Sequence, residues 1–259
     1  MAKAYFREAG SGPAVVCLHC SASTSGQWRP LMEQLAGRYR VIAPDLYGCG
    51  KSVPWPGERQ LRIEDQIAFL ASAFERAGER FHLVGHSYGG AIALKAALRL
   101  TTSLRSLVLY EPVLFSVLLS AAPQSDAARE IVAVRNDVVS GDPEVAARRF
   151  IDYWMGSGTW AATPEARRGT LVDAVKAQKP EWHSAFNEPT PLEAFAALDV
   201  PTLLMTGTGS TAAARAVARL VGGVLPRVRV EEIPGLGHMA PVTHPADINA
   251  RIERFLADL

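Results

Sequence analysis

Gly85-His86-Ser87-Tyr88-Gly89-Gly90 follows the apolar run Phe81-His-Leu-Val84 and precedes a stretch with helical spacing that begins Ala91-Ile-Ala-Leu-Lys. Gly-x-Ser-x-Gly between a strand and a helix is the pattern of a nucleophile elbow. Glycines are needed there because Cβ atoms beside the serine would collide with neighbouring backbone in so tight a turn. The pattern predicts that Ser87 projects as a nucleophile at a helix N-terminus, where the helix dipole favours developing negative charge. The alternative is a glycine-rich turn whose serine is incidental.

The elbow lies within a regular alternation of strand and helix patterns. Short apolar runs that fit buried parallel strands occur at residues 14–19, 40–44, 81–85, 104–110, 201–206 and 228–233. Stretches with helical spacing lie between or after them, at residues 27–36, 63–77, 89–100, 212–221 and 245–256. Residues 6–13 fit a short edge strand and a turn. The alternation predicts an α/β fold with a doubly wound, mostly parallel sheet.

A long segment without strand patterns interrupts this alternation. Between residues 113 and 194, helical spacing occurs instead, at residues 127–140, 144–154, 165–179 and 181–186. We expect this segment to be a helical cap insertion over one end of the sheet. Residues 1–112 and 195–259 would then form the core domain.

Aromatic side chains gather in the expected insertion, which holds three of the five tryptophans. Such rings form either the small core of the insertion itself or the lining of a pocket. We take four of them, together with one tryptophan from the loop after the first central strand, as candidate substrate-binding residues. These candidates are Tyr153, Trp154, Trp160, Trp182 and Trp28.

Charge, hydropathy and cysteine content exclude several kinds of partner. Lys and Arg number 27 and Asp and Glu 26, so a net charge of +1 gives no long-range attraction for nucleic acid. The longest apolar stretch, residues 107–122, is interrupted by polar residues and is shorter than the roughly 20 residues of a membrane-spanning helix. The N-terminus has no apolar leader, which predicts a cytoplasmic protein, and three cysteines fit a reducing compartment. Whether the chain forms a homo-oligomer is left open.

Two further motifs are weak. Cys17-Leu-His-Cys20 has C-x-x-C spacing, but a structural zinc site needs four ligands and no second pair follows. We therefore expect no metal, and redox use of this pair is the remaining alternative. Gly50-Lys51-Ser52 ends like a phosphate-binding loop, yet Asp45 stands where that motif requires glycine. We expect Asp45 to brace its own turn through hydrogen bonds to the backbone.

A serine hydroxyl needs a general base within hydrogen-bond reach. Of the six histidines, His238 is the best placed, because it lies in a Gly/Pro loop after the last predicted strand and before the final helix. Catalytic groups of parallel α/β sheets gather at the carboxyl ends of the strands, where this loop is expected. His82 begins a strand at the opposite end, and His244 fits a helix entry.

With these motifs, nearly the whole chain resembles the α/β-hydrolase fold superfamily. The resemblance rests on Leu18-His-Cys-Ser21, Asp45-Leu-Tyr-Gly-Cys-Gly-Lys-Ser52, the elbow and Gly237-His-Met239. The chain looks most like the cap-bearing esterases, lactonases and carbon–carbon-bond hydrolases. The resemblance implies that Ser87 is the nucleophile, that His238 is the base, and that the backbone N–H groups of Ser21 and Tyr88 form the oxyanion hole. Members generally have His-Gly where this chain has His19-Cys20.

The acid of the expected catalytic triad departs from the commonest pattern. The usual acid follows the strand at residues 201–206, but the loop at residues 207–211 contains no carboxylate. Glu111 ends the preceding strand at the same edge, and some members of the superfamily look similar in carrying their acid there. A carboxylate within an apolar run is costly unless it is paired, which favours an imidazolium partner. The alternative is a solvent-exposed glutamate at the entrance of the cap.

These residues predict a serine hydrolase that cleaves a small carboxylic ester or lactone through an acyl-enzyme, without a cofactor. One alternative uses the same triad to cleave the carbon–carbon bond of a ring-cleavage product or to form a peroxyacid. Another is a non-catalytic receptor or signalling protein with the same fold. A serine nucleophile argues against epoxide hydrolases and dehalogenases, which resemble this fold but use aspartate.

Overall fold

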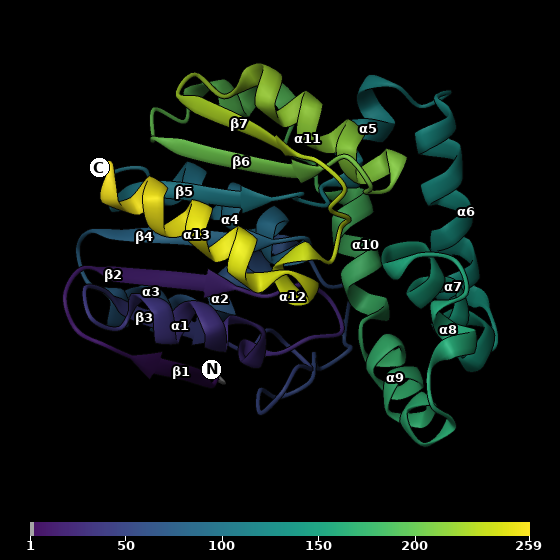
Figure 1. The fold of residues 1–259 in the computed structure, drawn as a ribbon. Coiled ribbons are helices and arrows are strands. Elements are labelled where there is room, and N and C mark those ends of the chain that lie inside the picture. The colour runs from purple at the N-terminus through teal and green to yellow at the C-terminus, as the bar shows by residue number, and fades with distance from the viewer. Residues whose placement is uncertain (1–2) are drawn as a thin grey trace.

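A seven-stranded sheet forms the centre of the protein (Figure 1), for which a computed structural model describes residues 3–259. The strands are β1 (Phe6–Ala9), β2 (Ala14–Leu18), β3 (Arg40–Pro44), β4 (Phe81–His86), β5 (Leu104–Tyr110), β6 (Thr202–Gly207) and β7 (Val228–Ile233). They lie in the order β1-β3-β2-β4-β5-β6-β7. Only the edge strand β1 pairs antiparallel, and the other pairings are parallel. The predicted doubly wound, mostly parallel sheet is confirmed.

Helices cover both faces of the sheet. On one face lie α1 (Arg29–Leu35) and α13 (Pro245–Ala257); on the other lie α2 (Ile63–Phe69), α3 (Ala71–Ala77), α4 (Tyr88–Leu100) and α11 (Ala212–Val224). Since both faces are covered, the central strand β2 is apolar at every position. Val15 and Cys17 pack on the side of α1, whereas Val16 and Leu18 pack on the side of α4.

Between β5 and β6 the chain forms helices and no strand. These are α5 (Phe115–Ala121), α6 (Asp126–Ser140), α7 (Pro143–Met155), α8 (Thr159–Ala162), α9 (Glu165–Ala177) and α10 (Lys179–Asn187). Figure 1 shows them together beyond the carboxyl ends of the strands, on the right of the view. The same edge of the sheet carries the predicted catalytic loops, so this helical segment faces them.

The helix boundaries differ from the predicted ones in a few places. The helix expected at residues 63–77 is divided at Leu70 into α2 and α3, and the one at 27–36 begins with a 3₁₀ turn, Ser25–Trp28. Pro30 lacks an N–H and fits only the first turn of an α-helix, so α1 starts beside it. The helix α5 was not expected, because it lies within a continuous apolar run whose periodicity is not visible. The short α8, α12 (Ala240–Thr243) and the 3₁₀ turn Leu192–Ala197 were also not expected.

Helix α4 approaches the end of β2 very closely at Gly89. A Cβ built on Gly89 would lie 2.4 Å from the carbonyl oxygens of both Leu18 and His19. Backbone atoms cannot yield as a flexible side chain can, so only glycine allows this approach. The close approach sets the elbow against the loop that follows β2.

Replacing Gly89 with alanine should therefore destabilise the protein by about 1–3 kcal/mol, the usual cost of forcing extra atoms into a packed region. The midpoint of urea unfolding measures the change. Gly223→Ala in α11 is the matched control, because a Cβ there meets nothing within 4 Å. Alanine favours a helix over glycine, so Gly223→Ala should unfold at an equal or higher urea concentration. An equal response of both variants would contradict the close approach.

Residues 3–259 contain neither a membrane-spanning helix nor a cluster of metal ligands. No helix in that range is both long and apolar enough to cross a membrane. No group of three or more His, Cys, Asp or Glu side chains in that range is arranged to hold a metal ion. Cys17, Cys20 and Cys49 are all buried free thiols. The cytoplasmic location stays a prediction.

Candidate active site

Ser87 occupies the turn between β4 and α4 with an unusual backbone conformation. Its φ of 57° and ψ of −118° lie in a region that side-chain-bearing residues rarely adopt. The conformation is held by hydrogen bonds from Ser87 N–H to Tyr110 O (3.0 Å) and from Val113 N–H to Ser87 O (3.2 Å). Neighbouring structure thus maintains the strain, as is usual where strained residues serve function.

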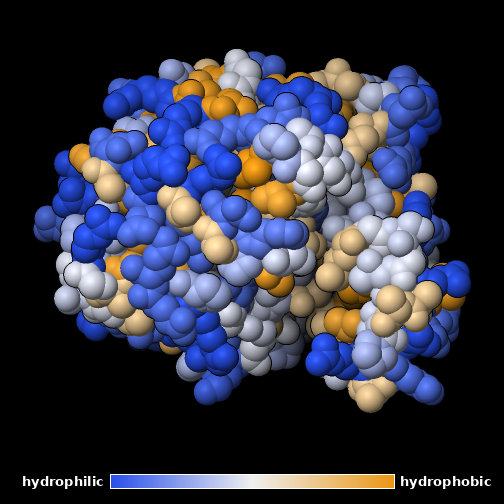
Figure 2. Space-filling model, viewed as in Figure 1, coloured by the Kyte–Doolittle hydropathy of each residue, from blue (hydrophilic) through white to orange (hydrophobic). Residues whose placement is uncertain are grey.

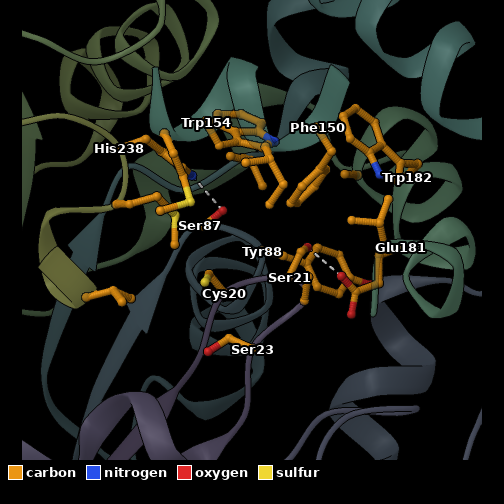
Figure 3. A pocket seen from close by; sticks show the side chains of 18 of the residues that line it. Cys20, Ser21, Ser23, Ser87, Tyr88, Phe150, Trp154, Glu181, Trp182 and His238 are labelled. Atoms are coloured by element: carbon orange, nitrogen blue, oxygen red, sulfur yellow. Dashed lines mark hydrogen bonds between the residues drawn. The ribbon is translucent and has the colours of Figure 1, made fainter. Parts of the chain in front are cut away.

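His238 lies beside Ser87, with Nε2 2.8 Å from Ser87 Oγ (Figure 3). Its loop follows β7 and is fixed by two side chains from the central strands. His86 Nε2 donates to His238 O at 2.9 Å, and the Tyr110 hydroxyl donates to Gly237 O at 2.8 Å. These bonds position an imidazole from the C-terminal part of the chain against a serine 151 residues earlier.

Glu111 completes a chain of three hydrogen-bonded side chains. It is fully buried, and its Oε2 accepts from His238 Nδ1 at 2.6 Å. Burial alone would raise the pKa of Glu111, but the hydrogen bond and charge of His238, with donors from Ser210 and Gly207, hold that pKa below its ordinary value. Because a carboxylate only accepts, Nδ1 carries a hydrogen, and in the neutral imidazole Nε2 then presents a lone pair to the Ser87 hydroxyl.

The end of β6 and the loop after it supply hydrogen-bond donors in place of an acid. Glu111 Oε1 accepts from the Thr206 hydroxyl and the Gly207 N–H, each at 2.8 Å, and Oε2 accepts from the Ser210 hydroxyl at 2.5 Å. The carboxylate that follows β5 is therefore bound by donors from the end of β6 and from the loop after it. Glu111, like Ser87, has a positive φ, 44°. The third non-glycine residue with a positive φ, Ala22, lies in the loop after β2.

Ser21 and Tyr88 lie on the cavity wall beside Ser87. Tyr88 is the first residue of α4, so its N–H has no partner within the helix. In the described part of the chain, neither the Ser21 N–H nor the Tyr88 N–H makes a hydrogen bond. Cys20 stands at the position where glycine was expected from the family resemblance. It is buried and donates its N–H to Gln27 Oε1 at 3.1 Å.

A cavity of about 200 Å³ opens at Ser87 and extends beneath the helical segment. Figure 3 shows Trp154, Phe150 and Trp182 along it, from His238 at one end to Glu181 at the other. The Trp154 ring lies over the imidazole, with 4.2 Å between the centres of the Trp154 and His238 rings. On the outside, Figure 2 shows a hollow between the sheet and the helices, with hydrophobic residues at its edges.

The structure separates the candidate pocket residues into two groups. Trp154 and Trp182 line the cavity, whereas Trp28, Tyr153 and Trp160 do not, and the expectation is wrong for these three. Trp28 packs with the α1 side of the sheet core, 2% exposed. Trp160 is buried within the helical segment under Arg168. Tyr153 lines a separate surface pocket, because successive residues of α7 point about 100° apart and Tyr153 is turned away from the cavity that Trp154 lines.

The remaining motifs also have their places. Asp45 Oδ2 accepts from Lys51 N–H at 2.9 Å, which braces its turn as expected, and Oδ1 accepts from Ser25 N–H at 2.6 Å. His82 donates to or accepts from Ser106 Oγ at 2.8 Å at the far end of the sheet. His244 precedes α13 as its N-cap residue.

Sequence reasoning missed the acidic residue of the cavity wall, Glu181. It lies in the first turn of α10, is buried, and accepts a hydrogen bond from Ser21 Oγ at 2.5 Å. Burial raises the pKa of Glu181 to about 8, although the Ser21 hydrogen bond opposes the shift. An acid in the first turn of a helix is ordinary and usually exposed, so no local signal marked this one.

Comparisons with known proteins agree with the resemblance seen in the motifs. The model of the Alpha/beta hydrolase family matches residues 15–251. The chain is 24% identical over 265 residues to a protein of Azorhizobium caulinodans named as a carbamate hydrolase, RutD, covering 98% of this chain and 95% of that one. It is 36% identical over 106 residues to a 2-hydroxy-6-oxo-2,4-heptadienoate hydrolase of Pseudomonas putida, covering 39% and 38%.

A match to an uncharacterized protein of Mycobacterium tuberculosis is 39% identical, but covers only 36% of this chain and 27% of that protein. Among solved structures, a thermophilic esterase from Thermogutta terrifontis superposes with a TM-score of 0.74 at 25% identity. That superposition covers 98% of this chain and 93% of the esterase.

Proposed function

This chain belongs to the Alpha/beta hydrolase family, and we propose that within the family it is a serine hydrolase of small carboxylic esters or lactones. The observation that carries the proposal is the hydrogen-bonded chain Ser87–His238–Glu111 at the end of an apolar cavity. Nucleophile, acid and base follow one another along the chain in the order that this fold uses. The likeness to a structure called an esterase adds support.

The proposed reaction uses His238 as base and then as acid. Ser87 Oγ attacks the carbonyl carbon while His238 Nε2 takes the hydroxyl proton, and the carbonyl oxygen becomes an oxyanion. The N–H groups of Ser21 and Tyr88 donate to that oxyanion. His238 returns the proton to the leaving alcohol as the acyl-enzyme forms. A water, deprotonated by the same Nε2, then releases the acid and restores Ser87.

In this proposal Glu111 acts only through His238. Its carboxylate fixes the imidazole tautomer and stabilises the imidazolium that forms when the serine proton moves. Because it is buried, the attraction between the two charges is screened less than it would be in water. Four hydrogen bonds hold the carboxylate in place, so it does not reorganise during the reaction.

We further propose that residues 113–194 act as the cap over a core of residues 1–112 and 195–259. Helices α7, α9 and α10 of this segment contribute Trp154, Val175 and Trp182 to the cavity. A cavity of about 200 Å³ with mostly apolar walls fits a modest acyl group better than a polymer.

The carbon–carbon hydrolase alternative fits the cavity less well. The Pseudomonas putida relative is named for a dienoate, which is a carboxylate. Among the described residues that line the cavity, no lysine or arginine is present to pair with such an anion. An enzyme that forms a peroxyacid would use the same triad. A receptor of this fold would differ from a hydrolase in that it would not turn over its ligand repeatedly.

Labelling with a fluorophosphonate tests the nucleophile and the base together. We expect peptide mapping to find the adduct on Ser87, and His238→Ala to abolish it. Ser106→Ala is the matched control, because Ser106 also bonds a histidine, His82 at 2.8 Å, but at the far end of the sheet. That variant should label as the wild type does. An adduct elsewhere, or equal labelling of His238→Ala, would contradict the proposal.

An ester panel then separates an enzyme from a receptor. Sustained hydrolysis after any initial burst supports the hydrolase. One slow turnover followed by a stable adduct would instead support a small-molecule receptor.

A further inference from the structure

Three buried glutamates differ in one respect, the presence of a basic partner. Glu111, Glu181 and Glu188 are 0%, 3% and 5% exposed. Glu111 pairs with His238, and Glu188 pairs with Lys95 Nζ at 2.9 Å. Within residues 3–259, no basic side chain forms an ion pair with Glu181. Buried carboxylates are normally paired, so Glu181 is the exception that needs an explanation.

The contacts of Glu181 are with neutral groups. The Ser21 hydroxyl donates to Oε2 at 2.5 Å, and the Gln178 amide, turned so that its nitrogen faces the carboxyl, donates to Oε2 at 2.8 Å. The nearest lysine along the chain, Lys179, sends its ammonium to Val139 O at 3.0 Å. These contacts satisfy oxygens but supply no positive charge.

The same carboxyl forms part of the cavity wall, among aromatic rings. Glu181 and Trp182 lie at the end opposite His238, with Phe150 and Trp154 between them (Figure 3). The Phe150 and Trp182 rings stand edge to face, 6.2 Å apart. Aromatic faces attract cations, and a carboxylate beside them strengthens the attraction. The wall therefore combines the two kinds of group that recognise an ammonium ion.

We propose that Glu181, with the rings of Phe150 and Trp182, is the binding site for an ammonium group of the substrate. This inference rests on the proposed function and deepens it: the substrate is a small ester or lactone that carries an amine. The bound ammonium supplies the positive charge that no side chain of the described protein provides to Glu181. Ser21 Oγ bonds Glu181, and in the proposed reaction the Ser21 N–H donates to the oxyanion, so the amine would lie only a few bonds from the reacting carbonyl.

The ionisation of Glu181 makes this preference depend on pH. Burial raises its pKa to about 8, so the empty site is mostly uncharged at pH 6 and must lose a proton to pair with an ammonium. The titratable groups packed around it are Cys20, Cys49 and Tyr88, whose pKa values burial raises well above this range. Recognition of an amine should therefore strengthen from pH 6 to pH 8 and then level off.

Matched methyl esters test the site, with hydrolysis followed by pH-stat. The pairs are methyl 6-aminohexanoate with methyl heptanoate and methyl 3-aminopropanoate with methyl butanoate, which differ only by ammonium for methyl. The amine ester of at least one pair should have the higher kcat/KM at pH 8, by about tenfold, the effect of one charge-assisted hydrogen bond. Monomethyl hexanedioate, an anion, should be the poorest substrate.

The quantity to compare is the ratio of kcat/KM for the amine ester to kcat/KM for its matched alkanoate. Because both esters depend equally on the ionisation of His238, that ionisation cancels from the ratio. That ratio should fall as the pH is lowered from 8 to 6, by up to about tenfold per pH unit. In Glu181→Gln it should drop to one or below and lose its pH dependence. Glu188→Gln is the control, since Glu188 is equally buried but paired with Lys95 and outside the cavity wall. It should keep the wild-type ratio.

The outcomes separate this inference from the proposed function. Hydrolysis of the alkanoates with no preference for either amine ester, or with the same preference in Glu181→Gln, would overturn the ammonium site alone. Hydrolysis of none of the esters would contradict the proposed ester hydrolase. Binding of hexylammonium and of hexan-1-ol, followed by the fluorescence of the cavity tryptophans, then tests the ammonium site without turnover. Hexylammonium must bind more tightly than hexan-1-ol, and Glu181→Gln must abolish that difference.

Discussion

Ser87→Ala is expected to lower kcat on a preferred ester by about 10⁴–10⁶, the range found when a serine nucleophile of a triad is removed. Without Oγ, no acyl-enzyme can form, and His238 has no hydroxyl to deprotonate. The cavity walls and the oxyanion donors remain, so KM should change little and a small residual rate should persist. Purified variant and wild type are compared at one pH on the same ester.

A structural readout must accompany that rate. Serine and alanine both carry a Cβ, so the strain of the positive φ at position 87 is similar in the two proteins. The thermal unfolding midpoint of Ser87→Ala should therefore stay near that of the wild type. Ser106→Ala, which removes a hydroxyl from the other serine–histidine contact, should retain turnover. Activity of Ser87→Ala within tenfold of wild type would show that another group is the nucleophile.

Glu111→Gln is expected to lower kcat by about 10³–10⁴ while the protein stays folded, because the carboxylate sets the imidazole tautomer and stabilises its charged form. A glutamine amide oriented with its nitrogen toward His238 would donate to Nδ1 and place the hydrogen on Nε2. Nε2 could then no longer accept the serine proton. Steady-state rates across pH, with circular dichroism on the same samples, measure the change.

The pH profile adds a sign to this prediction. The pKa of Glu111 is below its ordinary value in the folded protein, so its carboxylate is ionised at neutral pH. The contribution of this ionised group to the free energy of unfolding is complete above the unfolded-state pKa of about 4 and is lost as the pH falls through the folded value. Loss of activity in Glu111→Gln should therefore be uniform at neutral and alkaline pH. Glu188→Gln, a buried glutamate away from the cavity, should retain activity. A rate near wild type for Glu111→Gln would remove Glu111 from the triad.

Local features of the fold could be predicted because contiguous residues set them. Buried parallel strands are short apolar runs, and all six predicted central strands begin and end within one residue of the observed strands β2 to β7. The elbow is equally local, since a Cβ added at Gly85 or Gly89 would lie only 2.6 or 2.4 Å from backbone oxygens, so neither position tolerates a side chain. Helix α5 escaped prediction because an unbroken apolar run has no visible period.

The pocket was predicted less well, for a reason that α7 illustrates. Trp154 and Tyr153 are consecutive and both aromatic, but only Trp154 faces the cavity, because successive helical residues point about 100° apart. Which side faces inward depends on how α7 packs over the sheet. Trp28 shows the same limit, since its 3₁₀ turn directs the indole to the opposite core.

The amino-acid sequence by itself determined the doubly wound sheet, the elbow at Ser87 and the identity of the histidine and glutamate that could serve it. Each follows from neighbouring residues or from the order of loops at one edge of a parallel sheet. Only the tertiary structure decided that Glu111 lies against His238, 127 residues later, and that Glu181 reaches Ser21 across 160 residues. Such contacts depend on how separate elements pack. The burial of these acids and the charges near them therefore follow from the packing of the helices over the sheet and not from the neighbouring sequence.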